Sequence, residues 1–213
     1  FLESNPKYGF VKTDAKIFDE KDLKVPIGYL SKKSKNRFNE DLFEDFVYEK
    51  NNVYFAPGCY MVRMSAFLDV NPNRSIYVTK GGQNWQMLLP ISNKYKCGYI
   101  DEALYYYIVR KNSHSHASDG IFQKEIQKID NYLDVLKNVL NEMNLTKEQK
   151  DKYIYNLEIK FSRRKLGLAR RYKSKNVYIE NYNSLNKINK LPIKYKIFNL
   201  IIKIGNYRYF INN

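Results

Sequence analysis

The feature that most constrains the fold of this chain is a long apolar periodicity in its second half. From Phe122 to Met143, apolar residues recur at every third or fourth position: Phe122, Ile126, Ile129, Leu133, Leu136, Leu140 and Met143. This spacing matches one face of an α-helix and predicts a helix of about 23 residues. Ser118 or Asp119 is suitably placed to cap its start. The C-terminal part of the chain is therefore expected to be helical.

Three further helices are predicted after this one. Thr146 and Gln149 have the spacing of a capping box, and the apolar residues that follow continue a helical stripe through Leu168. Shorter helical patterns cover residues 177–188 and 193–204, and Gly205 is placed to end the last of them. No internal repeat or low-complexity linker interrupts this region.

The first part of the chain has a mixed pattern. Short β-branched and aromatic runs predict strands, and between them lie stretches with helical spacing. The predicted strands are 8–13, 52–56, 75–78 and 104–109, and the predicted helices are 37–48, 61–68 and 85–95. We therefore expect an α/β domain over residues 1–118, followed by an all-helical region over residues 119–213.

Charge is distributed unevenly between these two regions. The chain carries a net charge of +15, and residues 121–213 hold 20 Lys and Arg against 8 Asp and Glu. A composition rich in Lys, Asn, Tyr and Ile, as expected of an A/T-rich coding sequence, would raise basic residues everywhere. It does not explain why only one region is poor in acids, so the asymmetry indicates an anionic partner.

Two classes of structure are not indicated. The most apolar segment, 193–204, is interrupted by Lys194, Lys196 and Lys203, whereas a membrane-spanning helix needs about 18 apolar residues. Cys59 and Cys97 lack the spacing of a zinc site or a disulfide framework. We expect both to be reduced, buried thiols.

Three groups of residues are of types that commonly bind ligands or take part in catalysis. The run Gly81-Gly82-Gln83-Asn84-Trp85-Gln86 could bring backbone amides close to sugar hydroxyls or phosphate oxygens, or could be a loop that leads into a helix. The segment 110–116, with Arg110, His114 and His116, could hold a metal or a phosphate, or could be a solvated loop. Asp101 and Glu102 could serve as a base or as metal ligands, or could be surface acids.

Four segments together resemble the second half of the family 2 bacterial glycosyltransferases. They are Phe1-Leu2-Glu3-Ser4-Asn5-Pro6-Lys7-Tyr8-Gly9-Phe10-Val11 with Thr13-Asp14, Pro57-Gly58-Cys59-Tyr60-Met61-Val62-Arg63, Gly81-Gly82-Gln83-Asn84-Trp85-Gln86-Met87-Leu88-Leu89-Pro90, and Lys96-Cys97-Gly98-Tyr99-Ile100-Asp101-Glu102-Ala103-Leu104-Tyr105. The resemblance covers about residues 1–118 and does not extend to the helical tail.

The resemblance implies the acceptor-side half of a GT-A fold. The nucleotide-binding half, with a DxD motif that holds Mn²⁺ or Mg²⁺, would lie upstream of Phe1, and no DxD tripeptide occurs in this sequence. Because the chain begins with Phe1 and shows no signal peptide, we expect a fragment of a longer cytoplasmic protein. The full-length protein would be a metal-dependent, inverting glycosyltransferase, and this part alone is not expected to catalyse.

The resemblance also implies roles for particular residues. Members of the family commonly carry a Glu-Asp pair where this chain has Gln83 and Asn84, with the Asp as base. An amide cannot accept a proton at neutral pH, so the base is left to Asp101 or to an upstream acid. The acceptor pocket would be bordered by Gly58, Cys59, Tyr60, Gly81, Gly82 and Trp85. The diphosphate or metal would be contacted by Arg110, His114 and His116.

The expected partners are a nucleotide-sugar donor and a saccharide or lipid-linked acceptor, as in the synthesis of bacterial surface polysaccharides. The basic, amphipathic segment 193–213 suits the inner face of the cytoplasmic membrane, with Tyr195, Tyr207 and Tyr209 as anchors, or it packs on the catalytic domain. A non-catalytic sugar-binding or scaffolding relative is a second possibility, because of Gln83 and Asn84. A nucleic-acid binder is a third, because of the basic clusters at 163–165 and 170–173, although no recognised nucleic-acid motif accompanies them.

Overall fold

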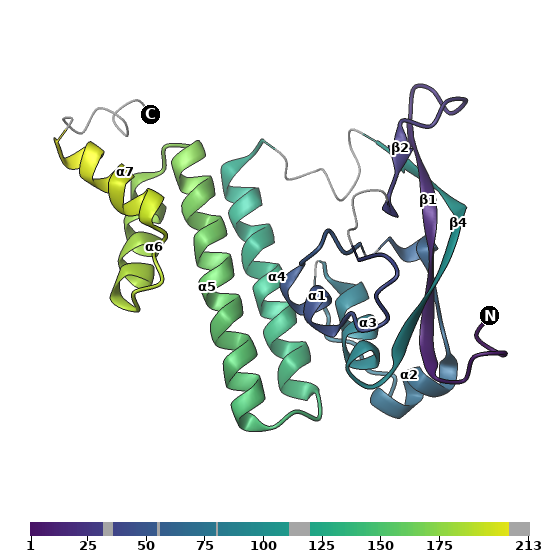
Figure 1. Ribbon diagram of the computed structural model, residues 1–213. Helices are drawn as coiled ribbons and strands as arrows, with labels where there is room; N and C mark the ends of the chain where they lie inside the picture. The colour runs from purple at the N-terminus through teal and green to yellow at the C-terminus, as the bar shows by residue number, and fades with distance from the viewer. Residues whose placement is uncertain (32–35, 55, 80, 111–119, 205–213) are drawn as a thin grey trace. The chain divides into compact units, whose positions relative to one another are not determined.

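The computed structural model describes residues 1–31, 36–54, 56–79, 81–110 and 120–204, and it divides the chain into two compact units. The first unit holds residues 1–117 together with 134–147, and the second holds residues 118–133 together with 148–213. The chain is mixed α/β, as expected, with its strands in the first unit (Figure 1).

The sheet of the first unit is built around strand β1, Tyr8–Asp19. Strand β4, Lys96–Val109, pairs with β1 in parallel along its whole length. The short strands β2, Gly28–Tyr29, and β3, Tyr60–Val62, pair with it antiparallel at Lys16–Ile17 and at Phe10–Lys12. Because β4 occupies one edge of β1 throughout, β2 and β3 share the other edge (Figure 1).

Three helices of the first unit contribute to its core, together with buried residues of the C-terminal part of α4, Phe122–Glu142. The three helices are α1, Phe43–Tyr48, α2, Met64–Val70, and α3, Gln83–Lys94. Phe10 of β1 and Phe46 of α1 are fully buried, with ring centroids 6.0 Å apart. Leu88, Leu89 and Ile91 of α3 are also fully buried, so α3 is a core helix despite Pro90.

The second unit is helical. It contains the first part of α4, Phe122–Glu142, together with α5, Lys147–Arg171, α6, Lys175–Lys187, and α7, Ile193–Ile204. One buried hydrophobic cluster of this unit is formed by Ile159, Leu166, Ala169, Tyr178, Leu185, Leu191 and Tyr195. All four helices predicted from the apolar period are confirmed, with α5 beginning directly after Thr146. Ser118, Asp119 and Gly205 lie outside the described residues.

Several predictions for the first unit are wrong in detail. Residues 75–78 form no strand, because the side chains of Asn71 and Gln86 bind the backbone of Ser75 and Tyr77. Residues 52–54 form no strand, and Asn52 has a φ of 53° that an extended strand does not allow. The helix expected over 37–48 begins only at Phe43, and residues 60–62, expected in part to be helical, form β3.

The structure also bears on the two cysteines and on membrane-spanning helices. Both cysteines are free and buried, which confirms the prediction for Cys59 and Cys97. Among the helices of the described residues, none has the length and apolar character needed to cross a membrane.

Candidate functional site

The structure joins two of the segments that the sequence singled out. The hydroxyl of Tyr60, at the start of β3, donates a 2.6 Å hydrogen bond to Oδ1 of Asn84, in the first turn of α3. The two residues are separated by 24 positions in the chain. The Pro57–Cys59 turn and the start of α3 therefore lie together and form the centre of the candidate site.

Gly82 sets the direction in which α3 starts. It occupies the N-cap position with φ 78° and ψ 16°, in the left-handed region that favours glycine. A Cβ atom at this position would lie 3.0 Å from Cγ1 of Val135 and 3.1 Å from Cε3 of Trp85. A side chain here would be both strained and crowded, so Gly82 is needed for the helix to begin where it presents Asn84 to Tyr60.

The residues on either side of Asn84 have different surroundings. Gln83 is exposed, and its Nε2 lies 3.4 Å from the carbonyl oxygen of Thr79. Trp85 is a core residue with 5% of its surface exposed, and its indole Nε1 donates a 3.1 Å hydrogen bond to the carbonyl oxygen of Phe46. A ring buried in this way offers no face on which a sugar can stack.

The turn before β3 contributes Gly58 and Cys59 to the candidate site. Gly58 lies against the ring of Tyr105, because a Cβ atom there would overlap Cε2 of that ring. Cys59 is buried, and burial raises the pKa of its thiol to about 11. The Cys59 thiol is therefore protonated at neutral pH and is not suited to act as a nucleophile.

The sheet beneath the site holds a buried lysine that the sequence analysis did not single out. Lys12 is paired with Tyr60 across the sheet and is only 1% exposed. Its Nζ lies 4.4 Å from the ring centroid of Tyr54 and 5.8 Å from that of Phe46. Burial lowers the pKa of Lys12, against the opposing effect of nearby Cys97 and Asp45. No sequence signal separates this lysine from the many exposed ones.

A buried carboxylate lies two residues further along β1. Asp14 accepts hydrogen bonds from the backbone amides of Ala15 and Ser31, at 2.7 and 2.8 Å, and from the hydroxyl of Ser31 at 2.5 Å. These bonds hold residue 31 against the sheet. Asp14 therefore has a structural role, and its oxygens are engaged by the protein itself.

Asp101 and Glu102 occupy a bulge in β4. Thr13 pairs with Ile100 and Asp14 with Ala103, so the two acids are extra residues relative to β1. A bulge of this kind changes the direction in which side chains project. Asp101 accepts a 3.2 Å hydrogen bond from the hydroxyl of Tyr99, and its Oδ1 lies 3.8 Å from Nε of Arg37. Asp101 is thus exposed and held by partners other than Tyr60 and Asn84.

The remaining predicted site residues lie near the end of β4 or beyond it. Arg110 is exposed directly after the strand. His114 and His116 lie outside the described residues. Within the described ranges, no group of three or more His, Cys, Asp or Glu side chains is arranged to hold a metal ion.

Tyr60 and Asn84 together offer hydrogen-bonding groups to a ligand. Burial raises the pKa of Tyr60, so its phenol remains a donor at neutral pH. Asn84 has an amide that can orient a hydroxyl but cannot remove its proton. The arrangement can therefore position a polyhydroxylated ligand at the start of α3, and it lacks a base of its own.

Comparisons of the chain with protein-family models, with curated proteins and with solved structures found no match.

Proposed function

We propose that the chain is the acceptor-side part of a GT-A-like glycosyltransferase. The reaction would move a sugar from a nucleotide-sugar donor to a saccharide or lipid-linked acceptor in the synthesis of a bacterial surface polysaccharide. The observation that carries the proposal is the hydrogen bond between Tyr60 and Asn84. It unites two segments that the resemblance to family 2 glycosyltransferases assigns to one acceptor pocket.

In this proposal the chain binds and orients the acceptor. Tyr60, Asn84 and the exposed Gln83 supply hydrogen bonds for acceptor hydroxyls at the start of α3. The exposed carboxylate of Asp101, or an acid upstream, would take the acceptor proton. By the resemblance, Mn²⁺ or Mg²⁺ would be held mainly by a DxD motif upstream of Phe1.

A lipid-linked acceptor would require contact with an anionic membrane surface, and α7 has features that support this. Ile193, Ile197 and Leu200 lie at helical spacing and are all exposed, and Lys194 and Lys196 are exposed beside them. An exposed apolar stripe flanked by cations suits the interface of an anionic bilayer. Tyr195, by contrast, is 6% exposed and belongs to the core of the second unit, so it is not available as an anchor.

The proposal is tested by nucleotide release from the protein encoded by the complete reading frame. UDP-, GDP- and dTDP-sugars are supplied with Mn²⁺ or Mg²⁺ and candidate lipid-linked acceptors. We expect metal-dependent release from one donor, lowered by Asn84→Ala and unchanged by the matched Asn144→Ala, which alters an exposed amide outside the site. A folded protein that releases no nucleotide from any donor would contradict the proposal.

A second candidate function is a non-catalytic sugar-binding or scaffolding relative. The specific observation in its favour is that Oδ1 of Asn84 already accepts a hydrogen bond from the hydroxyl of Tyr60. By the resemblance, a base would be needed at this position. In that case the protein binds saccharides and releases no nucleotide from a donor. The variant Asn84→Asp would then also release no nucleotide.

The basic clusters of α5 give less support to nucleic-acid binding. Lys165 forms an ion pair with Asp130. Both Nε and Nη2 of Arg163 donate to the carbonyl oxygen of Lys190, at 3.2 and 2.6 Å. These cations thus help to hold the helices of the second unit together.

A further inference from the structure

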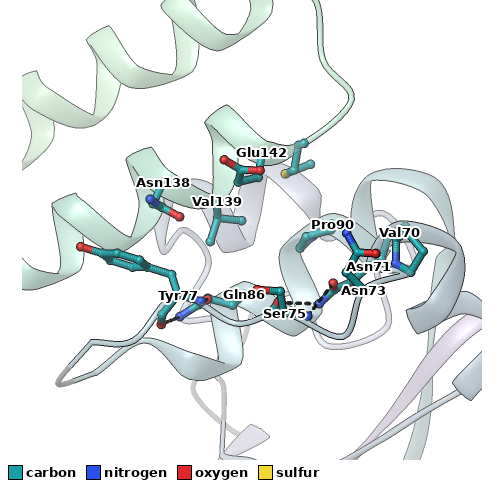
Figure 2. Close-up of a pocket in the computed structure, with 12 residues that line it drawn as sticks. Val70, Asn71, Asn73, Ser75, Tyr77, Gln86, Pro90, Asn138, Val139 and Glu142 are labelled. Carbon is teal, nitrogen blue, oxygen red and sulfur yellow. Dashed lines mark hydrogen bonds between the residues drawn. The ribbon is translucent and has the colours of Figure 1, made fainter.

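A cavity of about 570 Å³ lies in the first unit, and neither Tyr60 nor Asn84 lines it. Its walls come from the loop that follows α2, from α3 and from the C-terminal part of α4. Figure 2 shows side chains of the α4 wall and of the loop facing one another across the open space. The volume falls within the range of about 300–1,000 Å³ typical of small-molecule sites.

The loop wall of the cavity is held rigid by side chains. Oε1 of Gln86 accepts a 2.6 Å hydrogen bond from the amide of Tyr77, and its Nε2 donates a 2.8 Å bond to the Tyr77 carbonyl. Asn71 binds the amide and carbonyl of Ser75 in the same way, at 3.1 and 2.8 Å. Two amides therefore fix an irregular segment in place of a strand partner, and a wall that is already ordered binds a ligand at lower entropic cost.

The ring of Tyr77 is fixed as well. Its hydroxyl donates a 3.0 Å hydrogen bond to Oδ2 of Asp134, and this bond raises the pKa of the phenol. Tyr77 lines the cavity, and the residue as a whole is 42% exposed. It therefore offers a held aromatic surface at one side of the opening.

Asn73, Asn138 and Glu142 are polar residues that line the cavity and are not engaged by other side chains of the described residues. Asn138 and Glu142 are four positions apart on α4 and so lie on the same side of that helix. Asn73 lies on the loop opposite them (Figure 2). Within the part of the chain that the structure describes, none of the three side chains makes a hydrogen bond or ion pair. Donors and acceptors thus face the space from both walls.

The composition of the walls selects the class of ligand. The lining contains no Lys, Arg or His, and its only ionisable acid is Glu142, so a phosphate or a carboxylate ligand would be repelled. Amide and carboxylate groups pair well with hydroxyls, which both donate and accept. Val70, Pro90, Val139 and Met143 add apolar surface that suits the C–H faces of a sugar ring.

We propose that this cavity is a binding subsite for a neutral saccharide. The inference rests on residues other than those of the proposed acceptor site, and it holds whether or not the protein transfers sugar. Asn138 and Glu142 bind ring hydroxyls from α4, Asn73 binds them from the loop, and Tyr77 contacts the ring at the edge.

The test uses saturation-transfer difference NMR on the full chain with maltotriose, cellotriose and N,N′,N″-triacetylchitotriose, and with spermidine as a cationic comparison. We expect one of the trisaccharides to receive saturation. Glu142→Ala and Asn138→Ala should each weaken that binding about tenfold, because each removes a side chain that forms a hydrogen bond to the ligand.

Two controls separate this subsite from binding elsewhere. Asn144→Ala changes an exposed amide outside the cavity and should leave the affinity unchanged. Asn84→Ala reports separately on any binding at the proposed acceptor site. The proposal is overturned if no trisaccharide receives saturation, if only spermidine binds, or if binding is lost with Asn84→Ala and kept with both cavity variants. Thermal unfolding of each variant shows that the fold is retained.

Discussion

Tyr60 and Asn84 are joined by a 2.6 Å hydrogen bond that links the first residue of β3 to the first turn of α3. The bond connects the sheet to the helix that carries the candidate site. Its removal should therefore affect the stability of the first unit as well as the position of Asn84.

Tyr60→Phe removes the donor and keeps the ring. We expect the free energy of unfolding to fall by about 1 kcal/mol, since the half-buried Asn84 oxygen loses a partner. Urea unfolding followed by the fluorescence of Trp85, the only tryptophan, measures this. Tyr106→Phe is the matched control, because that residue is exposed and its hydroxyl makes no hydrogen bond to a described residue. Equal effects of the two substitutions would contradict the role of the bond.

Gly82→Ala should destabilise the first unit by about 1–3 kcal/mol. The new methyl group must adopt a φ of 78° and approach Val135 and Trp85. Gly28→Ala provides the control, because a Cβ atom there meets only Ile17, at 4.0 Å, and should be nearly neutral. Both variants are read by urea unfolding at Trp85, and an unchanged midpoint for Gly82→Ala would show that α3 does not need glycine at its N-cap.

Because Lys12 is buried, we expect the free energy of unfolding to depend on pH. Burial lowers the pKa of this lysine in the folded state below its ordinary value of 10.5. The unfolded chain therefore binds the proton more tightly, so the destabilising effect of Lys12 is full at pH values below the lowered pKa. It should fade as the pH rises towards 10.5.

Lys12→Met keeps the length of the side chain and removes its titration. The wild-type protein should gain stability relative to this variant between pH 7 and about pH 10, as measured by urea unfolding at Trp85. The comparison cancels the contributions of the buried thiols, which both proteins share. A difference between the two proteins that stays constant with pH would count against an unfavourable burial of the charge.

The exposed face of α7 predicts binding to anionic vesicles. The double variant Ile193→Ser/Ile197→Ser should sediment with phosphatidylglycerol vesicles about tenfold more weakly than the wild type, because it removes apolar surface from the interface. Ile179→Ser changes an exposed residue of α6 and should have no effect. Binding should fall with added salt and be absent with phosphatidylcholine. Failure of the wild type to bind phosphatidylglycerol at low salt would rule out this surface.

The helices of the second part of the chain could be read from the sequence because their signals are local. The apolar stripe from Phe122 onward and the capping spacing at Thr146 each depend on neighbours within one or two turns. The ends of α4, α5 and α7 agree with these patterns. The strand 8–13 was found for the same reason, through its short apolar run.

Specific side-chain contacts and packing decided the rest. Residues 75–77 have the composition of a strand, but Asn71 and Gln86 bind the backbone groups that a partner strand would need. Trp85 is a residue type that often stacks on sugars, but here it is buried in the core, where its indole N–H binds the carbonyl oxygen of Phe46. Lys12 is buried because strands on both sides and two aromatic rings surround it.

The sequence alone therefore determined the mixed α/β class and the amphipathic helices, since these depend on residue type and short-range periodicity. Only the tertiary structure brought Tyr60 to Asn84, placed Asp101 and Glu102 in a bulge, and opened the cavity beside Tyr77. The physical reason is that each of these features arises from pairing and packing between residues far apart in the chain, which no local pattern encodes.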